Sequence, residues 1–253
     1  MAKIITFANQ KGGIGKTTSA VNVAAALGKL GKKVLLVDLD PQGNTTSGVG
    51  VNKRTVRATA YDVLIARTAI GQATVTTPFD GLSVLPSNMN LAGAEFELVA
   101  ADRREARLRD ALEPVKGEYD YIVIDCPPSL GILTINALAA SDGVIIPMQC
   151  EYFALEGLSQ LTMTIRQVKK LYNPSLEVTG ILITMFNGRL NLSLSVLEEI
   201  KKYYRDRIFA TPVPRAVRLS EAPSYGKPIG YFDPHSKGAQ AYDAIAKELI
   251  QRI

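Results

Sequence analysis

The residues with the clearest capacity for chemistry lie near the N-terminus, in the stretch KGGIGKTT at positions 11–18. Its glycines have no Cβ atoms, so backbone N–H groups there can converge on an anion. Lys16 can reach the outer phosphates of a nucleotide, and the hydroxyl of Thr17 can ligate Mg²⁺. The stretch therefore predicts a phosphate-binding loop.

This loop departs from the strict pattern G-x-x-x-x-G-K-[ST] at its first position. Counting back from Lys16, the opening glycine belongs at position 10, where the sequence has Gln10. A second lysine, Lys11, begins the loop instead. The alternative, a glycine turn with incidental lysines, does not account for the apolar run before the loop and the helical pattern after it. The second lysine therefore needs a role of its own.

Two acidic motifs support a site for a nucleotide and a metal. In VLLVDLDPQGN an apolar run ends at Asp38 and Asp40, and in YIVIDCPP another ends at Asp125. Open α/β sheets bind ligands at the carboxyl ends of their strands. We expect Asp125 to hold a water molecule on the magnesium, and Asp38 and Asp40 to share one side if their strand continues. The alternative for each is an aspartate that only caps the next turn.

Short apolar runs alternate with helical patterns along the chain. Strands are predicted at 3–8, 33–38, 82–86, 119–125, 143–148 and 178–184, with a seventh candidate at 207–213. Helices are predicted from position 16 to a cap at Gly31, and at 102–113, 132–140, 154–172, 192–206 and 238–252. Runs that are apolar on both faces, alternating with helices, indicate a mostly parallel central sheet with helices on both faces. We expect one α/β domain over residues 1–253, with a long surface loop at 43–60.

The composition, with 47% hydrophobic and 21% charged residues, is that of an ordinary globular protein. No apolar stretch approaches the roughly 20 residues of a membrane span, and no signal-peptide pattern opens the chain. Two cysteines, Cys126 and Cys150, fit a reducing cytoplasm, and with a single histidine they argue against a metal site made of protein ligands alone. The net charge is +5, and residues 151–253 hold 14 Lys and Arg against 10 Asp and Glu. That surplus is a weak signal for a polyanionic partner.

At these motifs the chain resembles a known family. KGGIGKTT resembles the deviant Walker A motif of the ParA/MinD group of ATPases, LLVDLDPQGN its second nucleotide motif, and YIVIDCPPSLG its Walker B strand. DPQGNTTSG, DCPPSLGILTINAL, CEYFALEGLSQL and VPRAVRLSEAPSYGKPI are similar to the chromosomal ParA (Soj) proteins of that group. The resemblance runs from Lys3 to about Leu249 and implies a P-loop ATPase fold with ATP and Mg²⁺ as cofactors.

The resemblance gives the early lysine a role across a two-fold interface. In this group the residue at Lys11 contacts the nucleotide of the partner subunit, so two ATP molecules lie between two subunits of a homodimer. A charge-assisted bond to phosphate contributes about 1.5–3 kcal/mol, which can separate an ATP dimer from an ADP monomer. Gly12 is then expected where the two backbones approach most closely. The alternative is that Lys11 only neutralises the ATP of its own subunit.

The same resemblance implies roles for the other site residues. Asp40 is expected to orient or activate the attacking water, and Thr17 and Asp125 to organise the magnesium. Asp38 is expected to be structural or to support the residues that touch the ligand. The implied reaction is hydrolysis of ATP to ADP and phosphate, with Lys11, Lys16 and Asp40 as the catalytic set. The nucleotide-binding residues that the resemblance implies are Lys11, Gly12, Gly13, Ile14, Gly15, Lys16, Thr17, Thr18, Pro214 and Ala216.

Two further segments resemble family positions outside the phosphate loop. VPRAVRL is similar to the loop that holds adenine through Pro214 and the neighbouring backbone, although relatives often carry Asn where this chain has Ala216. Arg189 and Arg218 lie in predicted loops that resemble positions contacting DNA. The implied output is non-specific binding of double-stranded DNA by the ATP dimer, ended when a ParB-type centromere-binding protein stimulates hydrolysis. Other basic candidates, some with an alternative role beside helix C-termini, are Lys169, Lys170, Lys201, Lys202, Arg205 and Arg207.

Several other proteins share this phosphate chemistry. A nitrogenase-reductase-like protein needs cluster-bridging cysteines in different motifs, a signal-recognition GTPase needs an Asn-Lys-x-Asp base reader, and a capsule-type kinase carries a tyrosine-rich tail. A plasmid-type ParA has an N-terminal helix-turn-helix, which we do not expect because the first strand begins at Lys3. The main alternative is a MinD-like membrane switch, which needs an amphipathic extension after the last helix. We expect the apolar face of 238–252 to pack on the sheet, and we predict a cytoplasmic, nucleoid-associated protein with no membrane partner.

Overall fold

A seven-stranded sheet lies at the centre of the computed structural model, which describes residues 1–152 and 154–253. The strand order is β3-β4-β2-β5-β1-β6-β7, and every neighbouring pair is parallel except β3 with β4. This confirms the predicted fold class. The strands are β1 (Lys3–Phe7), β2 (Val34–Asp38), β3 (Val75–Thr76), β4 (Leu82–Leu85), β5 (Tyr121–Asp125), β6 (Gly143–Met148) and β7 (Glu177–Ile183).

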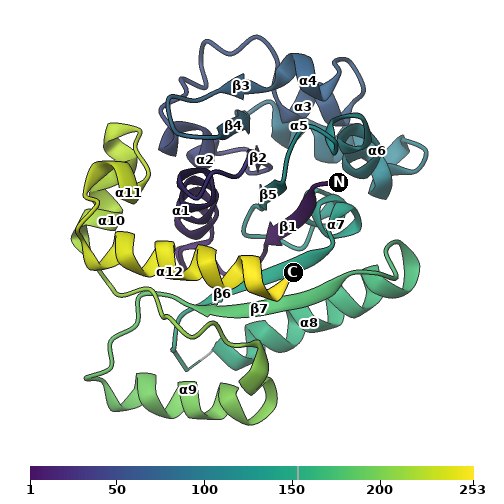
Figure 1. Cartoon of the computed structure of the whole chain (residues 1–253). Coiled ribbons are helices and arrows are strands. Elements are labelled where there is room, and N and C mark those ends of the chain that lie inside the picture. Colours follow the sequence, from purple (N-terminus) through teal and green to yellow (C-terminus); the bar gives the residue numbers. More distant parts are fainter. Residues whose placement is uncertain (153) are drawn as a thin grey trace.

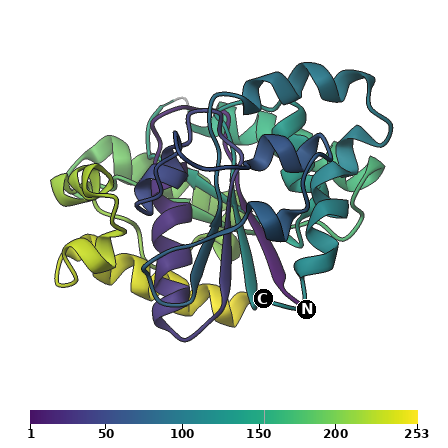
Figure 2. The same ribbon diagram turned by 90° about the horizontal axis from the view of Figure 1, so that it is seen from above.

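Helices cover both faces of this sheet (Figures 1 and 2). On one face, α1 (Lys16–Lys29), α11 (Ile229–Phe232) and α12 (Lys237–Arg252) pack on side chains such as Ile5 and Phe7 of β1. The opposite face carries α7 (Ile132–Ala140) and α8 (Ala154–Leu171), together with the smaller helices α3 (Ala60–Leu64), α4 (Ile70–Ala73), α5 (Leu91–Glu97) and α6 (Arg107–Leu112). Short helices α2 (Asn44–Gly48) and α10 (Val217–Glu221) and the longer α9 (Asn191–Tyr204) complete the α-helices.

The central strands bring the predicted site residues to one edge of the sheet. β2 and β5 are buried at every position, as expected of parallel strands covered on both faces. In the register, Asp125 pairs with Phe7 on one side and with Asp38 on the other. Three neighbouring strands therefore end at the same level, and the phosphate loop starts from that level.

The predicted strand at 207–213 is wrong. Residues 205–207 form a 3-10 turn, and the following segment meets the edge of β7 only at single points, through Phe209 N to Ile181 O (2.9 Å) and Val213 N to Ile183 O (2.8 Å). Pro212 and Pro214 have no N–H to donate, which prevents a continuous ladder. The seventh strand is β3, a two-residue antiparallel addition at the other edge.

The predicted surface loop at 43–60 is also wrong in part. Residues 44–48 form α2, and its residues Thr45 and Thr46 are completely buried. They lie beside β2 because their hydroxyls satisfy the carboxylates of Asp125 and Asp38. The segment is therefore a wall of the site.

The C-terminal helix α12 behaves as predicted. Tyr242, Ile245 and Leu249 are buried in the cluster that contains α1 and the sheet, so the apolar face of α12 is covered by the chain itself. Within the described residues, none of the helices combines the length and the apolar character that crossing a membrane requires.

Candidate nucleotide site

The loop between β1 and α1 has the backbone of a phosphate cradle. Gly13 and Gly15 adopt the left-handed region with φ of 71° and 86°, which residues with a Cβ rarely adopt. The space that a Cβ at Gly12 or Gly13 would fill is open. Thr184, directly after β7, fixes the loop, because its hydroxyl donates to the carbonyl of Ile14 at 2.7 Å. The loop is thus held from the sheet while its mouth stays open.

Lys16 extends from the first turn of α1 into this cradle. Only 6% of the residue is exposed, and its ammonium donates to the carbonyl of Lys11 at 2.9 Å. Burial lowers the pKa of Lys16, and the nearby carboxylate of Asp125 opposes that change. A buried cation at the rim of a ring of backbone N–H groups favours a polyphosphate over a neutral ligand.

Asp125 is the carboxylate that faces the cradle. One of its oxygens, Oδ2, accepts hydrogen bonds from the hydroxyls of Thr17 and Thr45, each at 2.7 Å. The other, Oδ1, is buried and has no hydrogen-bond partner among the described residues. Burial raises the pKa of Asp125 to about 6. Such an unpaired buried oxygen fits a group that brings a water molecule or a cation to it, as a magnesium–nucleotide complex does.

The strand does not continue from Asp38 to Asp40, because β2 ends at Asp38, so the condition for a shared side is not met. Asp38 is completely buried and accepts from the backbone N–H and hydroxyl of Thr46 at 2.8 and 2.6 Å, and burial raises its pKa to about 7. Asp40 lies beyond the strand end, where it accepts from Gln42 N at 2.8 Å. Its charge is near enough to Lys16 to affect the pKa of that lysine. Asp38 is thus tied to Thr46 in a buried network, and the charge of Asp40 acts on Lys16 in the cradle.

Thr46 offers a direct test of this buried network. Its hydroxyl donates to Asp38 and accepts from the backbone N–H of Ser87 at 2.8 Å. Thr46→Val keeps the shape but leaves both groups short of a partner, so we expect the free energy of unfolding to fall by about 1–3 kcal/mol. Urea unfolding of the nucleotide-free protein measures this. Thr55→Val, at an exposed turn, is the control and should stay within about 0.5 kcal/mol of wild type.

A cavity of about 530 Å³ continues from the phosphate loop. Gly13, Gly15 and Thr18 line it on one side, and Pro214 and Ala216 line it on the other. The segment with these two residues is placed there because Phe186 N donates to Val213 O at 2.9 Å. The structure therefore brings together two segments about 200 residues apart, the loop predicted to bind phosphate and the segment that the resemblance implies for the base.

The side chain of Lys11 lies outside the cradle. Its ammonium forms an ion pair with Glu151 at 2.5 Å, and both side chains are about half exposed. Its backbone carbonyl, by contrast, accepts the bond from Lys16. The two lysines of the loop thus have different surroundings, one buried in the loop and one at the surface.

The two arginines predicted to contact DNA differ. Arg189 is exposed in the turn before α9, where its backbone N–H donates to the Asn187 side chain. Arg218 is not in a loop, contrary to prediction. It lies on α10, where it is ion-paired with Glu221 at 3.0 Å and Asp233 at 3.5 Å.

Sequence reasoning missed three polar residues of the site. Thr45 and Thr46 are hidden in a Gly- and Thr-rich stretch that reads as a loop, and Thr184 ends an apolar strand. A search for hydroxyl side chains directly after strand-end motifs finds all three.

Comparison with known proteins agrees with this geometry. A family model described as an AAA domain matches residues 2–178. The sporulation initiation inhibitor protein Soj of Bacillus subtilis (strain 168) is 56% identical over 98% of both chains. The chromosome partitioning protein ParA of Myxococcus xanthus is 53% identical over 100% of this chain and 89% of its own. The chain belongs to the ParA/Soj family of chromosome-partitioning ATPases.

Solved structures show the same fold with nucleotide bound. Cobyrinic acid a,c-diamide synthase from Mycobacterium smegmatis, with bound ADP and magnesium, has a TM-score of 0.87 and 38% identity over 99% of this chain and 95% of that chain. A putative plasmid partition protein from Borrelia burgdorferi bound to AMPPNP has a TM-score of 0.86 and 29% identity over 100% of both. The predicted ParA/Soj resemblance and P-loop fold are thus confirmed.

Proposed function

We propose that this ParA/Soj-family chain is an ATP-dependent dimerisation switch for chromosome or plasmid partitioning, acting as one ATPase domain over residues 1–253. The observation that carries the proposal is the contrast between the two lysines of the phosphate loop. Lys16 is buried in the cradle, whereas the Lys11 ammonium stands at the surface on Glu151. One lysine is thus placed to bind a nucleotide in its own subunit, and the other is accessible to a second subunit.

ATP is the proposed nucleotide and Mg²⁺ the proposed metal. The loop N–H groups and Lys16 bind the phosphates, and residues 213–216 border the space for the base. Thr17, whose hydroxyl lies 2.7 Å from Asp125 Oδ2, is the proposed direct ligand of the metal, and Asp125 is proposed to act through water. The metal, when bound, neutralises the charge that develops on the phosphates. Asp40 is proposed to orient the attacking water.

For Lys11 to reach a partner's nucleotide, it must leave Glu151. The pair is half exposed, so its contribution to stability is below about 1 kcal/mol. A bond to phosphate contributes about 1.5–3 kcal/mol, and a two-fold dimer makes two of them. The exchange is therefore favourable when ATP occupies both subunits.

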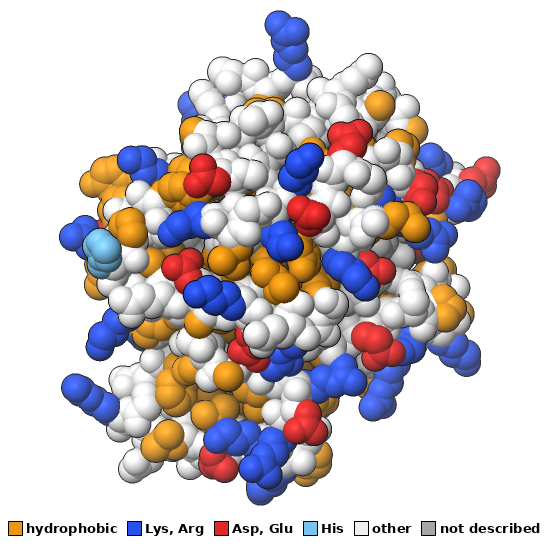
Figure 3. Space-filling model, viewed as in Figure 1, with side chains coloured by type: hydrophobic (Ala, Val, Ile, Leu, Met, Phe, Trp, Pro, Cys, Tyr) orange, Lys and Arg blue, Asp and Glu red, His pale blue; other side chains and the backbone are white. Residues whose placement is uncertain are grey.

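The proposed output is non-specific binding of double-stranded DNA by the ATP dimer. The surplus of basic residues in 151–253 supports it, although lysines 169, 201 and 202 are paired with glutamates. Figure 3 shows Lys and Arg interspersed with acidic side chains at the lower end of the molecule. A single subunit is therefore expected to bind DNA weakly. Joining two subunits in a dimer raises the affinity for DNA by effective concentration. Contact with phosphates alone carries no sequence information, which suits a protein that follows the whole nucleoid.

Release completes the cycle. We propose that a ParB-type protein bound at centromere-like sites stimulates hydrolysis and so returns the dimer to monomers that leave the DNA. The protein would accordingly be cytoplasmic and nucleoid-associated.

The function is tested by co-sedimentation of the protein with DNA and with anionic liposomes, each with Mg-ATP, Mg-ADP or no nucleotide. We expect binding to DNA with Mg-ATP only, and no binding to liposomes. Liposome binding with ATP and none to DNA supports the MinD-like alternative. That alternative lacks a candidate surface on α12, whose apolar face is buried. DNA binding that ignores the nucleotide contradicts the switch.

The salt dependence of DNA binding gives a quantitative prediction. If each subunit contributes two or three basic side chains, the dimer neutralises about 4–6 phosphates. The slope of log K for DNA binding against log salt is then roughly −4 to −5. Arg189→Ala and Arg218→Ala should flatten the slope and weaken all DNA sequences alike. We expect the smaller effect for Arg218, because it must exchange two carboxylates for phosphate.

Fluorescence anisotropy with labelled DNA, in saturating ATP and 50–200 mM salt, measures these slopes. Arg109→Ala is the control, because Arg109 lies on α6 and its guanidinium is bonded to Tyr172 O. An unchanged slope in both variants shows that these two arginines do not contact DNA.

The similarity to cobyrinic acid a,c-diamide synthase from Mycobacterium smegmatis suggests amide synthesis as a second candidate function. Identity to the Soj and ParA relatives, at 56% and 53%, exceeds the 38% to that protein. Amide transfer that proceeds through a cysteine nucleophile also needs a reactive thiolate. Both cysteines here are buried, and burial raises the pKa of Cys150 to about 11. The partitioning switch is therefore favoured.

A further inference from the structure

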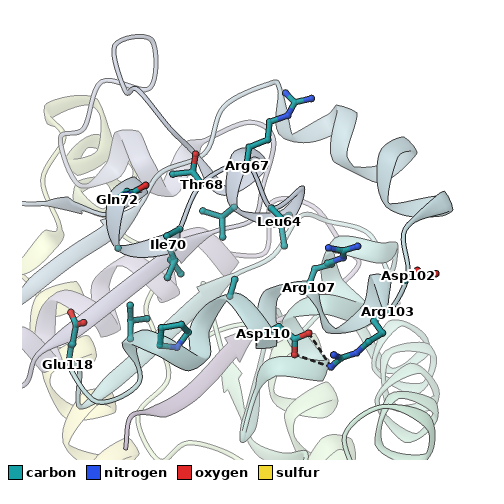
Figure 4. A pocket seen from close by; sticks show the side chains of 17 residues that line it. Leu64, Arg67, Thr68, Ile70, Gln72, Asp102, Arg103, Arg107, Asp110 and Glu118 are labelled. Atoms are coloured by element: carbon teal, nitrogen blue, oxygen red, sulfur yellow. Dashed lines mark hydrogen bonds and ion pairs between the residues drawn. The ribbon is translucent and has the colours of Figure 1, made fainter.

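A second hollow lies away from the phosphate loop, bordered by α3, α4 and α6 (Figure 4). Its volume is about 790 Å³, within the range of roughly 300–1,000 Å³ that small-molecule sites occupy. Buried apolar side chains form its floor, namely Val63, Leu64, Ile70 and Val115. Charged side chains stand around this floor, so the hollow combines an apolar base with a polar rim.

Among the arginines of this rim, Arg107 is the one that lacks a partner in the described structure. Its Nε atom is buried, and no hydrogen bond or ion pair joins its guanidinium to any residue that the structure describes. The other two arginines are engaged, since Arg103 pairs with Asp110 at 3.1 Å and Arg67 lies over the ring of Tyr61. A buried donor without a partner costs free energy, which a bound acceptor recovers.

The nucleotide site also contains a buried polar atom without a partner. Within the described residues, two buried side-chain polar atoms lack a partner: Oδ1 of Asp125, beside the phosphate cradle, and Nε of Arg107, beside this hollow. The proposed magnesium–nucleotide complex accounts for the first atom. Nothing in the proposed ATPase cycle accounts for the second.

Strained backbone conformations also occur beside both the nucleotide site and this hollow. In the described chain, three residues other than glycine adopt positive φ: Ala66 (60°), Arg103 (50°) and Met185 (49°). Met185 lines the cavity beside the phosphate loop, whereas Ala66 and Arg103 line the second hollow. Such conformations cost free energy and cluster at ligand sites. Two independent features thus single out this hollow and the nucleotide site together.

We propose that the hollow binds a small organic anion with an apolar body, whose carboxylate, sulfonate or phosphate group is held by the Arg107 guanidinium. Figure 4 shows Arg107, the Arg103–Asp110 ion pair and Asp102 at one end of the hollow and Glu118 at the other. Because Arg103 is already paired, the guanidinium of Arg107 is the group that orients an anionic head. The planar fork of arginine matches such a group with two parallel hydrogen bonds. The apolar body then covers the floor.

A matched pair of fluorescent probes tests the proposal. The probes are 1-anilinonaphthalene-8-sulfonate and N-phenyl-1-naphthylamine, which share the aromatic body and differ in the sulfonate. Titrations use the native full chain with excess Mg-ADP, so that the nucleotide site does not compete for the probe. We expect the sulfonate probe to bind at least tenfold more tightly than the neutral one, as a charge-assisted bond implies.

Three variants locate the binding. Arg107→Met keeps the length of the side chain and should weaken the sulfonate probe roughly tenfold while leaving the neutral probe unchanged. Ala111→Phe fills the hollow and should weaken both probes. Arg109→Met, on the same helix but outside the hollow, should change neither. Urea unfolding confirms that each variant is folded.

An unchanged affinity of Arg107→Met for the sulfonate probe overturns the proposal. So does equal affinity of wild type for the two probes, because the guanidinium then contributes nothing. Either result leaves the proposed ATPase switch untouched, since the hollow shares no lining residue with the cavity beside the phosphate loop.

Discussion

Lys16→Ala will lose ATP binding almost completely, with an expected loss of affinity of about 100-fold or more. Its ammonium is buried at the mouth of the phosphate loop, where it now donates to the Lys11 carbonyl. Contacts of this kind with phosphate contribute about 1.5–3 kcal/mol each, and a lysine at this position makes more than one. Isothermal titration with a non-hydrolysable ATP analogue and Mg²⁺ measures the loss.

Two controls separate binding from folding in that experiment. Lys16→Gln keeps a donor and most of the side-chain volume but removes the charge, so it should also bind poorly while unfolding like wild type. Lys29→Ala removes a lysine at the other end of α1 and should bind normally. An affinity of Lys16→Ala within threefold of wild type is incompatible with the assigned cradle.

Asp40→Ala should bind Mg-ATP, fail to hydrolyse it and accumulate as a dimer. Asp40 lies beyond the end of β2 and close enough to Lys16 to act on that lysine by its charge, whereas its neighbour Asp38 is tied into the buried network with Thr46. Its removal therefore spares the fold and affects the water that attacks the phosphate. Since dissociation follows hydrolysis in the proposed cycle, blocked hydrolysis traps the ATP dimer.

Light scattering coupled to size-exclusion chromatography measures the mass of this variant in saturating Mg-ATP. In Mg-ADP the same variant should be a monomer, which serves as the internal control. Rapid hydrolysis by Asp40→Ala would remove Asp40 from its proposed role.

Much of the fold could be predicted because the central strands are continuous apolar runs. Strands such as β2 and β5 are buried on both faces, and their sequences show it without knowledge of their neighbours. The apolar residues of α12 recur at helical spacing in the sequence, and its buried face was predicted correctly from them. The phosphate loop could be identified because its glycines and lysine act locally, through the backbone of a single turn.

What the sequence did not reveal depends on contacts between distant segments. The 207–213 segment looks like a strand, but its prolines and its position at the edge of β7 leave it with isolated bonds. α3 and α4 have only five and four residues, too few to show a helical period. The burial of Thr46 follows from Asp38, and the ion pairs of Arg218 include Asp233, 15 residues away. Such pairings have no local signal.

The most direct test of the switch compares Asp40→Ala with the double variant Lys11→Ala/Asp40→Ala. Hydrolysis is blocked in both, so any difference in mass reports the role of Lys11 in association alone. Each protein is titrated with Mg-ATP to confirm occupancy, and its mass is then measured by light scattering at the same concentration. Glu151→Ala/Asp40→Ala is the matched control, because it removes the other half of the Lys11 ion pair.

We predict that the Lys11→Ala/Asp40→Ala protein binds Mg-ATP with nearly normal affinity and remains a monomer, while Asp40→Ala and Glu151→Ala/Asp40→Ala are dimers. If the Lys11 double variant dimerises as fully as Asp40→Ala, or if it loses ATP binding as a monomer, then Lys11 serves only its own subunit and the proposed dimer is contradicted.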